Sequence, residues 1–253
     1  MEDNRREAIE FNETLVRRMV YAINKAITED VPQELRLHHL ETNNRCRFAP
    51  GDYINENLRR HVVNEGVDLI PFQRFVYEGR ILVDRKNKVT YTIVTFATLA
   101  TGARKHGTSP YYLQSILSVE NGDCEGTPKQ MTLGDYAEAM GFSTFSQEEY
   151  EADFDTIMQG AIGKDDGYRH YIIGYSAKRS EIQAIELLYL DSDFAEVDSR
   201  DLMEYIVPDF AMLTEVNYEN ESVQAEEETQ QHKLFKLRPG VKPALRAKEE
   251  EVL

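Results

Sequence analysis

Residues 80–96, RILVDRKNKVTYTIVTF, have the clearest secondary-structure pattern in the chain. Two apolar runs, Ile81–Val83 and Val89–Phe96, flank a polar segment of turn-forming residues. β-Branched and aromatic residues suit a pleated, half-buried surface, and two such runs around a polar turn are typical of a β-hairpin. Because both faces of the second run are largely apolar, we expect this strand to lie inside a sheet that is covered on both sides.

A second hairpin is predicted over residues 168–190. Its first run, YRHYIIGYS, alternates aromatic and polar residues, its second run is Ile185–Leu190, and the polar segment AKRSE lies between them. An isolated hairpin is barely stable in water, whereas several strands with helices packed on them form a stable unit. These patterns predict an α+β fold, in which the two hairpins form a mainly antiparallel sheet packed with helices.

Helical patterns occupy much of the remaining chain. Apolar residues recur at helical spacing over residues 3–28, which predicts a long amphipathic helix that starts at a cap on Asp3 or Asn4 and ends before Val31-Pro32. We expect this helix to pack on the domain, and its apolar stripe would also suit a dimer seam. Further helices are predicted to begin at Asp52, at Thr108 or Ser109, at Met131, at Ser146 with Glu149 completing a capping box, and at Asp198 or Ser199.

Residues 67–77, VDLIPFQRFVY, form an apolar run that contains Pro71. Proline cannot donate a hydrogen bond to a neighbouring strand, so the run predicts an edge strand or a broken one, leading into the first hairpin.

Composition divides the 253 residues into two regions. Residues 1–213 are predicted to form a single α+β domain. Residues 214–253 are acidic and lack periodicity, apart from the basic island HKLFKLRPGVKPALRAK, and this composition predicts a disordered tail. The island suits a partner-binding peptide, and a terminus without a role is the alternative.

The charge of the chain limits its partners. With 29 Lys and Arg against 45 Asp and Glu, the formal net charge is −16. Nucleic acid and anionic membranes repel such a protein, so we expect neither as a direct partner and expect a basic protein partner instead. Acidity that serves only solubility is the alternative.

The sequence also bears on location. Cys46 and Cys124 form no CxxC pair, which favours a reducing compartment. The first residues lack the apolar core of a signal peptide, and no apolar run approaches the ~20 residues that span a membrane. We therefore expect the protein in the cytoplasm.

Two surfaces are candidate binding sites. The first is a concentration of acids on the helix predicted after Ser146, and we expect it to contact a protein partner: Glu148, Glu149, Glu151, Asp153 and Asp155. The second is the segment between the first hairpin and the next helix, where basic residues and helix-start amides suit a phosphate or carboxylate: Arg104, Lys105, His106, Thr108 and Ser109. Thr108 stands where a P-loop has its lysine, which argues against nucleotide hydrolysis.

No catalytic constellation is predicted, and neither a cofactor nor a metal is expected. A metal-dependent nuclease site would need an acid-x-lysine pair on the strand after Asp84, and VTYTIVTF has none. Asp84 is therefore interpreted as a turn residue. His170 is interpreted as a surface or core residue of a strand, since a general base needs partners. His38, His39 and Cys46 lack the paired spacing of zinc ligands.

Four segments carry a resemblance to a known group of proteins: FAPGDYINENL, FVYEGRILVDRKNKVTYTIVT, SPYYLQSILSVEN and YRHYIIGYSAKRSEIQAIEL. Over about Asp52 to Phe210 the chain resembles an uncharacterised family of bacterial and phage-encoded cytoplasmic proteins. The resemblance implies a single α+β domain and an origin in mobile elements, and it assigns no functional residue.

These observations favour a non-enzymatic, acidic binding or regulatory protein. It would occupy a basic or nucleic-acid-handling protein, as a phage- or defence-associated regulator does. One alternative is a nuclease-like or phosphate-handling enzyme with an atypical site. Another is a structural or virion-associated protein that forms homo-oligomers through its sheet edges.

Overall fold

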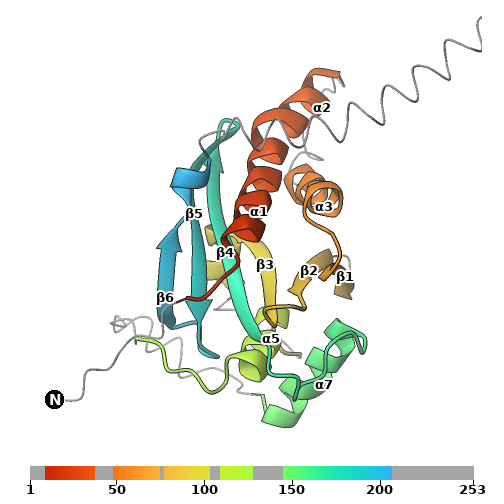
Figure 1. Cartoon of the computed structure of the whole chain (residues 1–253), viewed down its shortest axis with the longest axis vertical. Coiled ribbons are helices and arrows are strands. Elements are labelled where there is room, and N and C mark those ends of the chain that lie inside the picture. Colours follow the sequence, from red (N-terminus) through yellow and green to blue (C-terminus); the bar gives the residue numbers. More distant parts are fainter. Residues whose placement is uncertain (1–8, 38–47, 75–76, 103–108, 128–144, 207–253) are drawn as a thin grey trace, which may run out of the picture. The chain divides into compact units, whose positions relative to one another are not determined.

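The computed structural model describes residues 9–37, 48–74, 77–102, 109–127 and 145–206. Its centre is a six-stranded sheet whose strands follow one another in chain order (Figure 1). The strands are β1 (Val67–Arg74), β2 (Tyr77–Asp84), β3 (Val89–Thr95), β4 (Arg169–Lys178), β5 (Glu181–Leu190) and β6 (Glu196–Asp201). Neighbouring strands are antiparallel except β3 and β4, which are parallel. The predicted α+β fold with a mainly antiparallel sheet is confirmed.

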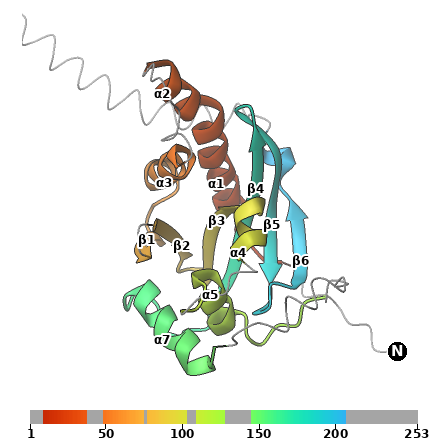
Figure 2. The ribbon, with the colours of Figure 1, turned by 180° about the vertical axis from the view of Figure 1, so that it is seen from behind.

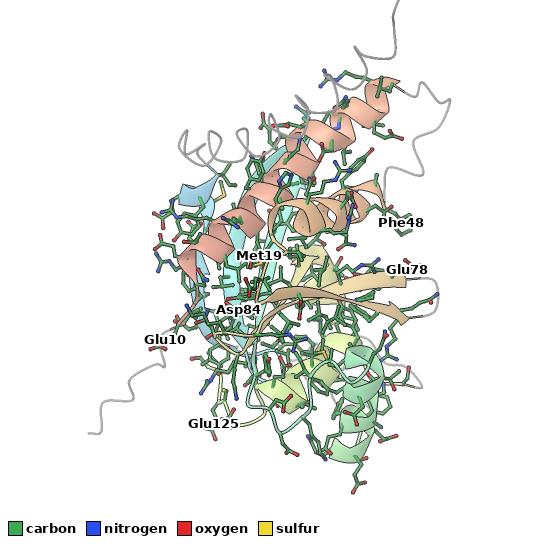
Figure 3. All side chains as sticks on the ribbon, turned by 45° about the vertical axis from the view of Figure 1, so that its right-hand side comes forward. Glu10, Met19, Phe48, Glu78, Asp84 and Glu125 are labelled. Atoms are coloured by element: carbon green, nitrogen blue, oxygen red, sulfur yellow. The ribbon has the colours of Figure 1, made fainter. Side chains whose placement is uncertain are left out.

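The first hairpin consists of β2 and β3, as predicted, and Asp84 organises its turn. The Asp84 carboxylate accepts hydrogen bonds from the backbone N–H groups of Lys86 and Asn87, both at 3.1 Å, and from the Asn87 side-chain amide at 2.6 Å. The Asp84 side chain is buried at the end of β2 (Figure 3). These contacts confirm the interpretation of Asp84 as a turn residue.

The second hairpin consists of β4 and β5, and its turn is shorter than expected. The two strands extend to Lys178 and Glu181, so only Arg179 and Ser180 remain between them. Both residues have positive φ, 53° and 64°. Two consecutive residues of this kind form the primed turn that matches the twist of a hairpin.

Helices cover both faces of the sheet. On one face lie α1 (Glu13–Lys25), the π-helical turn η1 (Ala26–Asp30), α2 (Val31–Leu37) and α3 (Ala49–His61). The connection between β3 and β4 carries α4 (Phe96–Gly102), α5 (Tyr112–Glu120) and α7 (Gln147–Met158), which lie on the other side (Figure 2). Parallel neighbours such as β3 and β4 need a long crossover of this type.

The alternation of side chains along β3 gives the sheet two separate cores. Tyr91 belongs to the core cluster on the α1 face, together with the fully buried Met19 and Ile23 of α1. Figure 3 shows Met19 on α1. Val94 points toward the other face and packs in the cluster that contains the apolar residues of α5 and α7. The prediction that this strand lies inside a sheet covered on both sides is confirmed.

The N-terminal helix differs from its prediction at both ends. It begins at Glu13, where the Asn12 side chain accepts the Leu15 N–H at 3.1 Å; the predicted caps, Asp3 and Asn4, lie outside the described residues. It does not end before Pro32 either, because η1 connects α1 directly to α2. A proline ring collides with the carbonyl four residues earlier in a regular helix, and the π turn changes the helix at that position.

Other helix boundaries also move. The helix expected from Asp52 begins at Ala49, and the helix expected from Thr108 or Ser109 begins at Tyr112. The prediction of a helix from Asp198 or Ser199 is wrong, because these residues belong to strand β6, which pairs with β5. A short 3-10 helix, Met203–Tyr205, follows the strand. The helix α4 was not predicted.

Two local predictions hold. Ser146 caps α7, and the Ser146 and Glu149 side chains accept hydrogen bonds from each other's backbone N–H groups in a capping box. The strand that contains Pro71, β1, lies at the edge of the sheet. The helix predicted to begin at Met131 falls outside the described residues.

Candidate functional site

A cavity of about 740 Å³, here called the α5 pocket, opens at the C-terminal end of α5. The loop before α7, the loop before β4 and the turn after β5 complete its wall. It is lined by Gln114, Ser118, Val119, Glu120, Gly122, Asp123, Phe145, Gln147, Tyr150, Lys164, Gly167, Tyr168, Arg169, Ser192 and Asp193. Its size is in the range of small-molecule and peptide sites.

Glu120, the last residue of α5, is the most buried carboxylate in this wall, with 3% of its side chain exposed. Its Oε2 accepts a hydrogen bond from the Thr90 hydroxyl on β3. Its Oε1 is also buried, yet no donor reaches it from the part of the chain that the structure describes. A buried polar atom without a partner is costly and rare in native proteins, so this oxygen needs an explanation.

A chain of hydrogen bonds continues from Glu120 to His170, which is fully buried on β4. The Thr90 Oγ1 lies 2.7 Å from the His170 Nδ1, and the Thr92 Oγ1 lies 2.9 Å from the His170 Nε2. With the Thr90 hydroxyl donating to Glu120, the directions agree when Nδ1 carries the proton and Nε2 accepts from Thr92. The imidazole is therefore a satisfied core group, which agrees with the interpretation of His170 as a structural strand residue.

Asn121 fixes the position of Glu120 by connecting the end of α5 to the sheet. Its side-chain amide donates to the His170 and Leu190 carbonyls, both at 2.8 Å, and its Oδ1 accepts the His170 N–H at 2.9 Å. All three bonds are buried. Asn121 thus connects the end of α5 to β4 and β5. This connection holds the Glu120 carboxylate beside Thr90.

The α5 pocket contains acids and bases, and its two bases have partners. Lys164 donates to Glu151 at 2.5 Å, a hydrogen bond that raises the pKa of the ammonium group and lowers that of the carboxyl group. Arg169 donates to the Tyr189 hydroxyl and lies 3.7 Å from the Cys124 sulfur. Asp123 and Asp193, both exposed, also line the pocket.

The five acids of the predicted protein-interaction surface have different roles. Glu148, Glu149 and Asp155 are exposed on α7, and Glu149 also belongs to the capping box. Glu151 is half-buried and pairs with Lys164. Asp153 accepts from Arg74 and, at 2.5 Å, from the Ser115 hydroxyl, so it joins α7 to β1 and α5. The structure therefore gives Asp153 a structural role, and the surface prediction remains for the exposed acids.

The predicted anion-binding segment is outside what the structure describes, except Ser109. Arg104, Lys105, His106 and Thr108 fall in the gap between residues 102 and 109. Ser109 precedes α5 by three residues and is half-buried. Anion binding by this segment remains a prediction.

The residues considered for a metal or nuclease site do not come together in the part of the chain that the structure describes. No three His, Cys, Asp or Glu side chains within those ranges are grouped to hold an ion. The Asp84 carboxylate accepts hydrogen bonds from Lys86 and Asn87 in its own turn, and β3 has no acidic residue. His38, His39 and Cys46 lie in the gap between residues 37 and 48.

Sequence analysis found His170 but missed Glu120 and Asn121. One signal was present: Thr90 and Thr92 are polar residues on the same face of a largely apolar strand. Thr90 lies opposite His170 in the parallel pairing of β3 with β4. Without that register, neither the pairing nor the approach of Glu120 could be inferred.

The fold and the site define the class of protein: an α+β domain with a six-stranded sheet between two helical layers and a buried polar network beneath a cavity. The chain belongs to the family of unknown function DUF5986, whose model matches residues 8–253. The match extends beyond the predicted resemblance at Asp52 to Phe210. No curated protein and no solved structure matches the chain. Among the described residues, no helix combines the length and apolar character of a membrane span.

Proposed function

We propose that this protein is a binding protein of the cytoplasm that captures a basic protein partner on its acidic C-terminal half. Residues 1–102 contain 15 Lys and Arg and 15 Asp and Glu, so residues 103–253 carry the whole net charge of −16. This segregation of charge is the observation that supports the proposal. Clustered charge of one sign attracts an oppositely charged partner and raises the rate of association.

Exposed acids surround the α5 pocket on several elements. Asp123 and Asp193 line it, Asp165 and Asp166 lie in the loop before β4, and Glu148 lies at the start of α7. Their contribution is to steering and specificity more than to affinity, because exposed charges are screened by salt.

A protein that handles nucleic acid is the partner class that this surface suits. Such proteins gather Lys and Arg to bind phosphates, and an acidic protein surface can occupy the same basic groove. On this proposal the chain regulates its partner by competing with nucleic acid. Association with phage or defence systems is a natural setting for such a regulator.

The test compares two variants, each with two acidic side chains replaced by neutral amides, for their capture of partner proteins from host cells. Glu148→Gln/Asp155→Asn removes two charges from the acidic half, and Asp52→Asn/Glu65→Gln removes two exposed charges from the neutral half. We expect the first variant to lose the captured basic protein and the second to retain it, with the difference between them largest at low salt and shrinking as salt screens the exposed charges. Equal recovery with both variants, at low and high salt, would contradict the proposal.

A further inference from the structure

We infer that the α5 pocket is a socket for an arginine side chain, with the Glu120 carboxylate as its anchor. The inference rests on the proposed function and adds to it one recognition site and one residue type in the partner. Its basis is the combination of an unpartnered buried carboxylate oxygen with a cavity whose lining suits a guanidinium group.

The placement of Glu120 is unfavourable in three ways if its role is only structural. Its carboxyl group is buried, its Oε1 has no donor within the described residues, and it is the last residue of α5. The C-terminal end of a helix carries partial negative charge, which disfavours a carboxylate there. Local conflicts of this type are typical of functional sites, where a ligand provides what the fold does not.

The lining of the pocket favours arginine over lysine. Phe145, Tyr150 and Tyr168 supply aromatic side chains, and a planar guanidinium stacks on such rings whereas an ammonium group is compact and strongly hydrated. The ring centroids of Phe145 and Tyr150 lie 6.0 Å apart at an interplanar angle of 73°, so they present differently oriented surfaces.

Charge balance also agrees with a cationic guest. The lining carries three acids, Glu120, Asp123 and Asp193, against two bases, and one of these bases, Lys164, is paired with Glu151. The five N–H donors of a guanidinium exceed what Glu120 alone accepts, and Asp123 and Asp193 at the mouth supply further acceptors.

The test titrates the full chain with a blocked Gly-Arg-Gly peptide, followed by NMR and calorimetry. Blocked Gly-citrulline-Gly, of nearly the same shape but neutral, and Gly-Lys-Gly are the comparison ligands. We expect saturable binding of the arginine peptide only, with a shift of the His170 ring signals, because Thr90 connects that ring to Glu120.

Glu120→Gln keeps the shape of the side chain and removes its charge, and Glu65→Gln makes the same change at an exposed position. We expect Glu120→Gln to weaken arginine-peptide binding by about tenfold or more, as loss of a charge-assisted hydrogen bond predicts. Its melting temperature should be no lower than that of the wild type, because the bare carboxylate oxygen is unfavourable. Glu65→Gln should match the wild type in both measurements.

The outcomes separate this inference from the proposed function. Equal peptide binding by wild type and Glu120→Gln, or no binding by the wild type, overturns the arginine socket. Neither result affects the capture experiment, which depends on the exposed acids Glu148 and Asp155 and not on the buried Glu120. If Glu120→Gln melts lower than the wild type, Glu120 is a structural residue, and the inference fails unless the His170 signals of the wild type respond to the arginine peptide.

Discussion

Two neighbouring residues at the end of α5 use their buried polar groups in opposite ways. Asn121 has each side-chain donor and acceptor engaged with the backbone of β4 or β5. Glu120 has one oxygen engaged and one without a partner in the described structure. The first pattern is that of a residue selected for stability, and the second is that of a residue whose partner arrives from outside.

Asn121→Ala is expected to destabilise the protein by about 3 kcal/mol, because it leaves three buried backbone groups without partners. Urea unfolding followed by circular dichroism measures the change. Asn64→Ala, at an exposed position, is the control and should stay within about 0.5 kcal/mol of the wild type. A similar stability for both variants would show that water replaces the Asn121 contacts.

At the residue scale, the sequence predicts contacts between residues close together in the chain and does not predict contacts between residues far apart in it. The Asp84 turn and the Ser146 capping box depend on residues within three positions of each other, and both were predicted. The contact of Thr90 with Glu120 spans 30 residues, and the contact of Asn121 with His170 spans 49. Such contacts follow from the crossover and the β3–β4 register, which local patterns do not determine.

At the element scale the strands were predicted better than the helix boundaries. Hairpins are defined by short apolar runs and a turn, so β2 to β5 were recognised. The helix that passes Pro32 was not, because a proline normally ends a helix. There, Asn57 of α3 donates to the Ala22 carbonyl at 3.3 Å and to Asp30 at 2.7 Å, so tertiary contacts support the π turn. Strand β6 was mistaken for a helix because its polar composition is compatible with one. In the structure its pairing with β5 outweighs that composition.

The exposed and half-buried acids of α7 are expected to respond differently to mutation. Asp153→Ala should destabilise the protein by about 2–3 kcal/mol, since it leaves the part-buried Arg74 without its carboxylate partner. Asp155→Ala, two residues further along α7 and exposed, should change stability by less than about 0.5 kcal/mol. Urea midpoints of the two variants measure this, and equal effects would refute the structural role of Asp153.

At the scale of the molecule, the α1 side of the sheet is rich in buried tyrosines. Tyr91, Tyr171, Tyr175 and Tyr189 all belong to that core, and burial raises the pKa of each hydroxyl. Tyr91 and Tyr171 pack edge to face, as do Tyr171 and Tyr189. Aromatic contacts of this kind add stability beyond the area that they bury.

These tyrosines predict a loss of stability in alkali. Burial raises the pKa of Tyr175 to about 12 from an ordinary value of 10, so its contribution is complete below pH 10 and disappears as the pH rises through 12. Urea unfolding at increasing pH, together with tyrosinate absorbance, measures the effect. Tyr175→Phe should flatten the dependence between pH 10 and 12, and an unchanged slope in that variant would contradict the assignment.

The beginning and the end of the described domain are tied together. The Ile9 N–H donates to Asp198 on β6 at 3.1 Å, the Tyr205 hydroxyl donates to Glu13 at 3.1 Å, and Arg17 lies 4.4 Å from the centroid of the Tyr205 ring. These contacts join α1 to the last strand and the 3-10 helix. The domain therefore needs residues up to about 206, and nothing in these contacts requires the predicted tail.

Truncation tests the predicted boundary at residue 213. A chain of residues 1–213 should melt within about 2 °C of the full chain, because it retains the contacts of Asp198 and Tyr205 with the N-terminal helix. A chain of residues 1–195 loses β6 and exposes the edge of β5, so it should melt at least about 8 °C lower or fail to fold. Thermal unfolding by circular dichroism compares the three chains. A large drop for residues 1–213 would place the tail within the folded domain and move the boundary beyond 213.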